Sequence, residues 1–117
     1  MSDHQPTRAE VLATLTATGQ PFELVDSTVF GRDCRFFKNA PATLRDLYSD
    51  NASDLEFLVY EDERLTYAEA YSKSAQIAHL LIQQYGIHKG DRVAISMRNY
   101  PEWVLSFMAV TSIGGIA

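Results

Sequence analysis

The pattern of apolar and polar positions over the first forty residues predicts a short helix followed by a pair of strands. Thr7 precedes residues 8–17 with the spacing of a capping box, which indicates the start of a helix. Residues 22–30 and 34–38 are rich in Phe and Val and lie on either side of a Gly-Arg-Asp sequence at 31–33. This arrangement is typical of a small antiparallel ribbon with its turn at 31–33.

Three further elements follow in the middle of the chain. The first is a short helix at residues 43–49, which begins with a Thr and has an Asp three positions later. In residues 55–60, successive side chains fall on two opposite faces, as in a strand, and one of these faces is strongly apolar. The apolar face carries Leu55, Phe57 and Val59. The strand leads into a charged turn at 61–64, after which Leu65 closes a hairpin.

The strongest helical pattern covers residues 67–85. Thr66 and Glu69 have capping-box spacing at its start, and Gly86 is suited to end it. Side chains at three- and four-residue spacing form one face of this helix. That face consists of Ala70, Ser74, Ile77, Leu81 and Tyr85.

A strand and a helix are predicted in the last part of the sequence. Residues 93–97 are small or apolar almost throughout, which is typical of a strand covered on both faces in a parallel sheet. Asn99 can cap the following helix at 101–113, which has Pro at its first position. The glycines at 114–115 turn the chain toward another apolar segment at 116–117. Together these elements predict an α/β fold and the beginning of a parallel βαβ unit.

The composition describes an ordinary soluble globular domain. The chain has 117 residues, of which 46% are apolar and 21% charged, and its net charge is −5. Its ten Lys and Arg residues are scattered, so nucleic acid is not an expected partner. Cys34 is the only cysteine, which excludes an intramolecular disulfide, and a cytoplasmic location is expected. The longest uncharged run, 103–117, is shorter than the roughly 20 residues of a membrane span, so no integral membrane contact is expected.

Side chains with catalytic or metal-binding chemistry do not form a recognisable site in the sequence. A nucleophilic pair of Cys34 with a histidine could form only through the fold, and a structural thiol is the favoured interpretation. His79 is interpreted as a partly buried or flanking residue of a helix. The carboxylates of Glu61, Asp62 and Glu63 could suggest acid–base catalysis, but such clusters in turns are usually solvated. Zinc-ligand spacing is absent, because Cys34 stands alone and the histidines are far apart. These histidines are His4, His79 and His88.

Two other features have both a structural and a functional interpretation. The six glycines match neither the dinucleotide-binding nor the P-loop pattern, so Gly114 and Gly115 are interpreted as a helix stop. In the helix at 101–113, five side chains could line an acyl pocket. They are Trp103, Val104, Phe107, Met108 and Thr111. Because this helix is apolar on nearly all sides, a place in a layered core is the favoured interpretation.

Four short motifs resemble, in order and spacing, the N-terminal region of adenylate-forming ligases. The motifs are Leu-Thr-Tyr-Ala-Glu at 65–69, Gly-Asp-Arg-Val-Ala-Ile at 90–95, Asn-Tyr-Pro-Glu-Trp at 99–103 and Ile-Gly-Gly at 113–115. This superfamily includes acyl- and aryl-CoA synthetases, luciferases and nonribosomal adenylation domains. The resemblance is clear from about Pro41 onward. Gly115 departs from it, because many members of the superfamily have Ala there.

The resemblance implies the incomplete N-terminal part of a layered αβαβα domain, with the antiparallel ribbon near its start and the parallel βαβ unit at its end. Residues 1–42 would form an N-terminal helix and β-ribbon, and residues 43–117 the beginning of the large AMP-binding domain. The implied parent enzyme joins a carboxylate to ATP as an acyl-adenylate and transfers the acyl group to coenzyme A, with Mg²⁺ as a further cofactor. The superfamily's phosphate loop, adenine motif, ribose aspartate and mobile lysine have no counterpart here. No catalytic, cofactor-binding or metal-binding residue is therefore assigned, and no cofactor is expected for the chain alone.

Two hypotheses from different classes follow. The leading one is a scaffold fragment of an acyl-CoA synthetase that is inactive alone and has the remainder of the ligase as its partner. The alternative is a small interaction module that associates with itself or with a partner through the apolar helix at 101–113. Exposure of that helix would also favour a homo-oligomer of the fragment. A stand-alone enzyme that uses Cys34 or His79 is the weakest option, because no catalytic constellation surrounds either residue.

Overall fold

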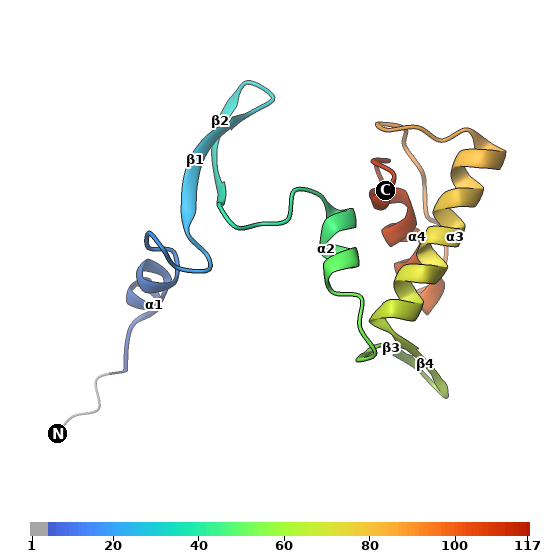
Figure 1. Cartoon of the computed structure of the whole chain (residues 1–117), viewed down its shortest axis with the longest axis horizontal. Coiled ribbons are helices and arrows are strands. Elements are labelled where there is room, and N and C mark those ends of the chain that lie inside the picture. Colours follow the sequence, from blue (N-terminus) through green and yellow to red (C-terminus); the bar gives the residue numbers. More distant parts are fainter. Residues whose placement is uncertain (1–4) are drawn as a thin grey trace. The chain divides into compact units, whose positions relative to one another are not determined.

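A computed structural model describes residues 5–117, so His4 lies outside the described part of the chain. The chain divides into two compact units, the first extending to Ala40 and the second spanning Pro41–Ala117. Within the described residues there are four helices and four strands, and the strands form two separate two-stranded antiparallel sheets (Figure 1). The predicted α/β class and the predicted ribbon near the start of the chain are therefore confirmed.

The first unit begins with helix α1, Arg8–Leu15, which has the predicted capping box. The N–H of Glu10 donates to Thr7 Oγ1 at 3.3 Å, and the Thr7 N–H donates to the Glu10 carboxylate at 2.7 Å. The helix ends two residues earlier than predicted. Thr14 and Thr16 are β-branched, and their hydroxyls donate to main-chain carbonyls four residues earlier. Such side chains weaken a helix, which explains the early end.

Strands β1, Leu24–Val29, and β2, Arg32–Phe37, pair along their whole length. The loop between them consists of Phe30 and Gly31, which both have positive φ, 49° and 76°. Positive φ at both loop residues is typical of a type I′ turn, which matches the twist of the flanking strands. The predicted turn at 31–33 is therefore wrong, because its last two residues already pair with β1.

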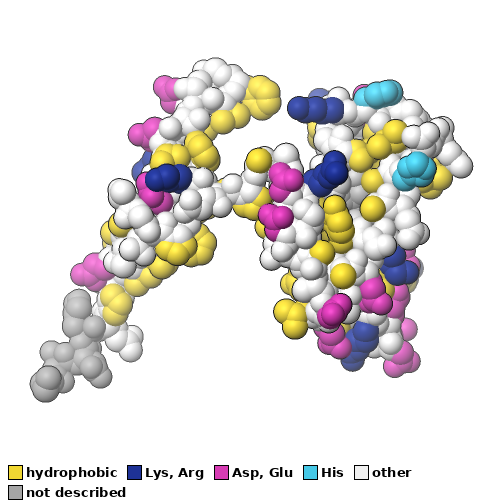
Figure 2. All heavy atoms as spheres, in the orientation of Figure 1, with side chains coloured by type: hydrophobic (Ala, Val, Ile, Leu, Met, Phe, Trp, Pro, Cys, Tyr) yellow, Lys and Arg dark blue, Asp and Glu magenta, His cyan; other side chains and the backbone are white. Residues whose placement is uncertain are grey.

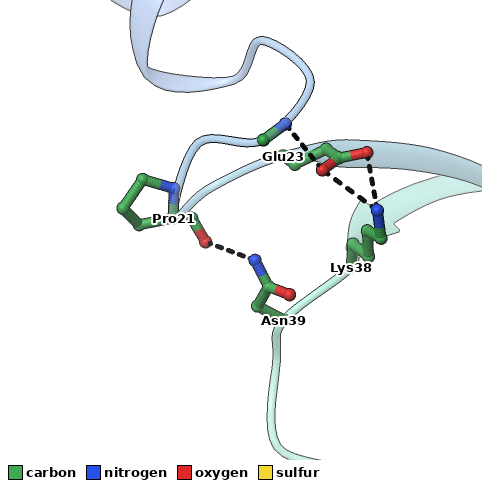
Figure 3. A network of polar contacts seen from close by, with 5 residues as sticks. Pro21, Glu23, Lys38 and Asn39 are labelled. Atoms are coloured by element: carbon green, nitrogen blue, oxygen red, sulfur yellow. Dashed lines mark hydrogen bonds and ion pairs between the residues drawn. The ribbon is translucent and has the colours of Figure 1, made fainter.

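Glu23 joins the two ends of the hairpin and is the one buried side chain of the first unit within the described residues. Its carboxylate accepts from Lys38 Nζ at 3.1 and 3.2 Å and from the Gly19 N–H at 2.9 Å (Figure 3). The Gly19 N–H, and after it the Lys38 ammonium, hold the pKa of Glu23 below its ordinary value. Asn39 Nδ2 donates to the Pro21 carbonyl at 3.3 Å beside them. This cluster fixes the open end of the hairpin.

The second unit begins with helix α2, Leu44–Asp50, which has a capping box formed by Thr43 and Asp46. Strands β3, Glu56–Tyr60, and β4, Glu63–Thr66, follow as an antiparallel hairpin. The short helix and the hairpin predicted for this part of the chain are confirmed.

A β-bulge in β3 changes which of its side chains face the core. The pairing register shifts between Glu56 and Leu58, and both Phe57 and Leu58 pack against the core. Leu55 and Val59, which were predicted on the apolar face, are 71% and 54% exposed. The predicted alternation is wrong at Val59, because one extra residue in a strand inverts the two faces beyond it, and at Leu55, because the strand begins only at Glu56.

Helix α3, Tyr67–Tyr85, has the predicted bounds and both predicted ends. The Glu69 N–H donates to Thr66 Oγ1, and the Thr66 N–H donates to the Glu69 carboxylate at 2.9 Å. The Thr66 N–H, and after it the Thr66 hydroxyl, act on the Glu69 carboxylate and hold the pKa of Glu69 below its ordinary value. Gly86 ends the helix with a φ of 62°. The buried side chains of α3 are small: Ala70, Ser74 and Ala78.

Helix α4, Pro101–Ser112, packs against α3 (Figure 1). It contributes four of the buried apolar side chains, Leu105, Met108, Ala109 and Val110. The small side chains of α3 let the two helices approach closely. Because α4 has 12 residues and α3 has 19, α4 is too short to cover all of α3. Tyr85, predicted on the same face as Ala70 and Ser74, is accordingly 67% exposed. The cap prediction is also wrong, because the N-cap residue is Tyr100 rather than Asn99.

Residues 93–97 do not form the predicted strand. Arg92 and Ile116 make a single parallel bridge. The Val93 N–H donates to the Ile116 carbonyl at 2.9 Å, and the Ile116 N–H donates to the Asp91 carbonyl at 2.8 Å. A strand is stabilised by a neighbour that pairs along its length, and the pairing here is limited to one bridge. The direction of that pairing is parallel, as predicted for a βαβ unit.

Candidate functional site

A concave surface of the second unit lies between α2, α3 and the C-terminal end of α4. Two adjoining cavities of about 620 and 240 Å³ occupy it. The residues that line both cavities are Arg45, Tyr71, Ser112 and Ile113. We call this surface the three-helix groove. Since three helices contribute to it, the groove exists only when the second unit is folded.

The three-helix groove carries positive charge and hydroxyl groups. Arg45 lines it from α2, and Lys89 lines it from the loop after α3. The carboxylate of Asp46 is also present, but it accepts from the N–H and the hydroxyl of Thr43 in the capping box. Ser112 Oγ is buried and has no hydrogen-bond partner among residues 5–117. The groove therefore offers polar contacts, whereas no base activates its serine as a nucleophile.

Gly114 and Gly115 end α4, as predicted. The Gly115 N–H donates to the Val110 carbonyl at 2.9 Å and the Gly114 N–H to the Thr111 carbonyl at 3.2 Å, which is the Schellman pattern. Gly114 has a φ of 79°, and a Cβ there would lie 2.9 Å from Lys89 Cγ. A Cβ at Gly115 would lie 2.9 Å from Val110 Cγ1. Both N–H groups are thus occupied, and alanine at 115 would require the Val110 side chain to move.

The side chains considered for nucleophilic or acid–base chemistry are exposed. Cys34 lies in the middle of β2. His79 lies on α3 and lines the three-helix groove. Glu61 and Asp62 form the tip of the β3–β4 hairpin, and Glu63 is the first residue of β4. Within the described part of the chain, none of these side chains has a hydrogen-bonded catalytic partner.

The α4 side chains considered for an acyl pocket divide between two environments. Met108 is 5% exposed and belongs to the core, as predicted. Trp103 is 36% exposed and stacks on Phe107, with ring centroids 5.6 Å apart and an interplanar angle of 8°. We call these two residues the α4 aromatic pair. Thr111 Oγ1 lies 3.1 Å from the Tyr48 hydroxyl and links α4 to α2 by a hydrogen bond.

Residues 5–117 contain no group of three side chains that could hold a metal ion. In the same range, no helix is both long enough and apolar enough to cross a membrane.

Sequence reasoning did not predict the three-helix groove. Arg45, Tyr71 and Ser112 are far apart in the sequence, and no motif connects them. The available signal was the helical spacing that places Tyr71 beside the Ser74 stripe of α3. That signal could not show that α2 and the end of α4 meet this side of the helix.

Comparisons with known proteins identify relatives of the chain. Residues 48–117, more than half of the chain, match the family model described as AMP-binding enzyme. A medium/long-chain fatty-acid–CoA ligase of Mycobacterium tuberculosis is 32% identical over 108 residues, which cover 86% of this chain and 18% of the relative. An acetyl-coenzyme A synthetase of Mesorhizobium japonicum is 39% identical over 57 residues, which cover 49% of this chain and 9% of the relative. The chain therefore spans less than a fifth of the length of either relative.

Solved structures show the same fold. The N-terminal subdomain of NpsA from Klebsiella oxytoca, in complex with anthranilyl-AMSN, matches with a TM-score of 0.55 and 29% identity over 62% of this chain and 18% of that protein. An anthranilate CoA ligase in complex with anthranoyl-AMP matches with a TM-score of 0.59 and 23% identity over 64% of this chain and 15% of that protein. The α/β elements of the chain thus match the N-terminal subdomain of adenylate-forming enzymes.

Proposed function

Because the chain belongs to the AMP-binding enzyme family, we propose that it is the N-terminal scaffold of an ATP-dependent acyl-CoA ligase. Such a ligase activates a carboxylate with ATP, releases pyrophosphate and transfers the acyl group from the acyl-adenylate to coenzyme A. The family match over residues 48–117 carries the proposal. The similarity to a fatty-acid–CoA ligase and to an acetyl-coenzyme A synthetase supports a carboxylic acid as the substrate.

The scaffold role is supported by what the second unit builds. Helices α3 and α4 form a closely packed pair. The Schellman turn at 114–115 then directs the chain back beside residues 91–93, where Arg92 and Ile116 make the first parallel bridge. A parallel sheet grows by adding strands beside such a pair and is covered by helices. The second unit therefore supplies a start for the sheet on which nucleotide-binding elements of the ligase pack.

The residues of this chain do not fit ATP. A phosphate-binding loop presents unoccupied N–H groups to the anion, whereas Gly114 and Gly115 use theirs to end α4. The other glycines of the sequence do not have phosphate-loop spacing. We assign the binding of ATP, Mg²⁺ and coenzyme A to other parts of the ligase, and the chain alone is expected to be inactive.

The α4 aromatic pair supports a role for the remainder of the ligase as the partner of this chain. Trp103 is 36% exposed although it lies on the most apolar helix of the second unit. Full burial of a large apolar side chain contributes about 1.5–3 kcal/mol, so a partner that covers this pair would stabilise the second unit. We assign the pair to the interface with the remainder of the ligase. Self-association through α4 is the competing outcome.

A chimera tests the scaffold role. Residues 41–117 replace the aligned residues of the Mycobacterium tuberculosis ligase, and pyrophosphate release is measured with ATP, Mg²⁺ and a series of fatty acids. We expect the chimera to keep most of the parent's activity. A matched chimera with Gly114→Leu is expected to lose most of it, because a side chain is strained at the φ of 79° and its Cβ would lie 2.9 Å from Lys89 Cγ. An inactive chimera that is as stable as its parent would contradict the scaffold role.

A second measurement tests the expected inactivity of the chain. The purified 117-residue chain is incubated with ATP, Mg²⁺ and carboxylates from acetate to palmitate. We expect no pyrophosphate release that depends on the carboxylate. Release that depends on one of these acids, and that survives repurification, would show that the chain itself carries an adenylation site.

A further inference from the structure

Strand β2 has an outer edge whose main-chain groups point away from β1. The Lys38 N–H donates to the Glu23 carbonyl at 2.8 Å, just beyond the paired strands. In an antiparallel ladder, bonded and non-bonded pairs alternate from one residue to the next. Residues 32, 34 and 36 therefore direct their N–H and C=O groups to β1, while Asp33 and Arg35 direct theirs outward. No main-chain partner of these outward groups occurs among residues 5–117.

The outer edge of β2 is protected against pairing with another strand by charge alone. Protected edges carry charged side chains, proline, a β-bulge or a covering segment, and β2 carries Arg32, Asp33 and Arg35, which admit only a partner of complementary charge. β2 contains no proline, and its register with β1 is continuous. The edge of β1 is partly covered, because the Leu24 N–H donates to the Thr16 carbonyl at 3.4 Å. An open hollow of about 540 Å³ lies along the middle of the hairpin. Its lining residues are Asp26, Ser27, Thr28, Asp33, Cys34 and Arg35.

We propose that β2 pairs in antiparallel orientation with β2 of a second copy of this chain, in the register that places Cys34 opposite Cys34. The direction of the main-chain groups permits three symmetric registers near the middle of the strand. Centring on residue 33 places Asp33 opposite Asp33, and centring on residue 35 places Arg35 opposite Arg35. Like charges directly opposite each other destabilise a strand pair. Centring on Cys34 instead places Asp33 of each copy opposite Arg35 of the other.

The register centred on Cys34 gives the outward N–H and C=O groups hydrogen-bond partners and places opposite charges next to each other. Asp33 and Arg35 of opposite copies become hydrogen-bonded pairs, which exchange two main-chain hydrogen bonds each. Arg35 has no ion-pair partner within the described residues. Asp33 Oδ1 accepts from the Thr28 hydroxyl of β1 at 2.9 Å, so the partner copy's Arg35 has to share this carboxylate with Thr28. Two hairpins joined in this way form a four-stranded sheet, which is more stable than an isolated two-stranded hairpin.

Cys34 reports on the pairing without being needed for it. At a non-hydrogen-bonded pair the two Cα atoms are about 4.5 Å apart, and a disulfide joins Cα atoms at about 4.4–6.8 Å. Glutathione disulfide can therefore oxidise the dimer. Two Cys34 thiols lose their protons and two electrons and form one S–S bond, while one glutathione disulfide is reduced to two glutathione molecules. Such a bond forms rapidly only when the two thiols are already close.

The test uses the full 117-residue chain. Sedimentation equilibrium in reducing buffer gives the dissociation constant of the dimer, and glutathione disulfide gives the rate of Cys34 cross-linking. Asp33→Arg places Arg opposite Arg at both charged pairs and is expected to weaken the dimer about tenfold. The double variant Asp33→Arg with Arg35→Asp restores opposite charges and is expected to regain the affinity. The double variant lacks the Asp33–Thr28 hydrogen bond just as the single variant does. Its recovery would therefore show that the single variant is not weakened by local damage to the hairpin.

Each outcome decides the proposal. The proposal is supported if the single substitution weakens the dimer and the double variant regains the affinity. The rate of Cys34 cross-linking should change in parallel. A chain that stays monomeric at all concentrations overturns the proposal. A dimer whose affinity Asp33→Arg leaves unchanged also overturns the proposal. A dimer that Trp103→Ser dissociates, while neither charge variant weakens it, overturns the proposal as well. Cys34→Ser is expected to abolish the cross-link and to leave the affinity unchanged, and a loss of affinity in this variant would also overturn the proposal.

Discussion

The two units contain similar local elements and differ in what they bury. Each has a helix with a threonine capping box and an antiparallel hairpin. In the second unit, seven apolar side chains besides Pro101 are buried, whereas the first unit buries none of its described apolar side chains and has many of them at its surface (Figure 2). The most exposed of them include Leu12, Phe22, Val29, Phe30 and Phe37. Caps and turns are therefore enough to form elements, while the core of the second unit forms where side chains of α3, α4 and the β3–β4 hairpin meet.

The largest expected effect removes a contact between α3 and α4. Leu105 is 6% exposed, and Leu105→Ala is expected to destabilise the second unit by about 2–5 kcal/mol, because it leaves a cavity in a close-packed core. Urea unfolding followed by Trp103 fluorescence measures this change. The control is Leu12→Ala in α1, where Leu12 is 49% exposed, and it is expected to change stability by less than about 0.5 kcal/mol. Equal effects of the two substitutions would contradict the contrast between the units.

A second prediction compares two glycines that both follow helices of the second unit. Gly86 and Gly114 have φ values of 62° and 79°, but a Cβ at Gly86 meets open space, while one at Gly114 lies 2.9 Å from Lys89 Cγ. Gly86→Ala is expected to cost about 1 kcal/mol from backbone strain alone. Gly114→Ala adds the contact with Lys89 and is expected to cost more. Thermal unfolding checks the order, which would be reversed if the Schellman turn of α4 were easily rearranged.

A third prediction uses the capping box that occurs in both units. Thr66→Ala removes the cap of α3, which packs on α4, and is expected to destabilise the second unit by about 1 kcal/mol. Thr7→Ala removes the same cap from α1, which has no buried residue, and should only increase fraying of that helix. Amide hydrogen exchange distinguishes the two results. Protection in α3 should fall in step with global stability, whereas the change from Thr7→Ala should remain within α1.

The smallest expected effect depends on pH. The Gly19 N–H and the Lys38 ammonium hold the pKa of Glu23 below its ordinary value, so the ionised form is favoured in the folded hairpin. A lowered pKa contributes stability above the unfolded-state value, and this stability is lost as the pH falls through the lower folded-state value. Amide protection in the hairpin should therefore decrease as the pH falls below about 4.5. In Glu23→Gln this pH dependence should be absent, and its persistence would point to another carboxylate.

Some elements were predicted correctly from the sequence and others were not. The bounds of α3 were predicted, because a capping box, a long amphipathic pattern and a terminal glycine all agreed. Residues 93–97 were predicted as a strand from composition, but they form none, and the one parallel bridge lies just before them, between Arg92 and Ile116. A strand depends on a neighbour that pairs along its length. The three-helix groove was not predicted, since Arg45 and Ser112 are brought together by packing that no local pattern encodes.

The sequence by itself determined where α3 starts and stops and that the chain resembles adenylate-forming ligases. The ends of α3 depend on groups a few positions apart, as at Thr66 and Glu69, so local residue types were sufficient to define them. The tertiary structure decided which side chains are buried. The bulge at Phe57 and the approach of α4 to α3 depend on residues far apart in the chain, and their energies arise only when those residues are in contact.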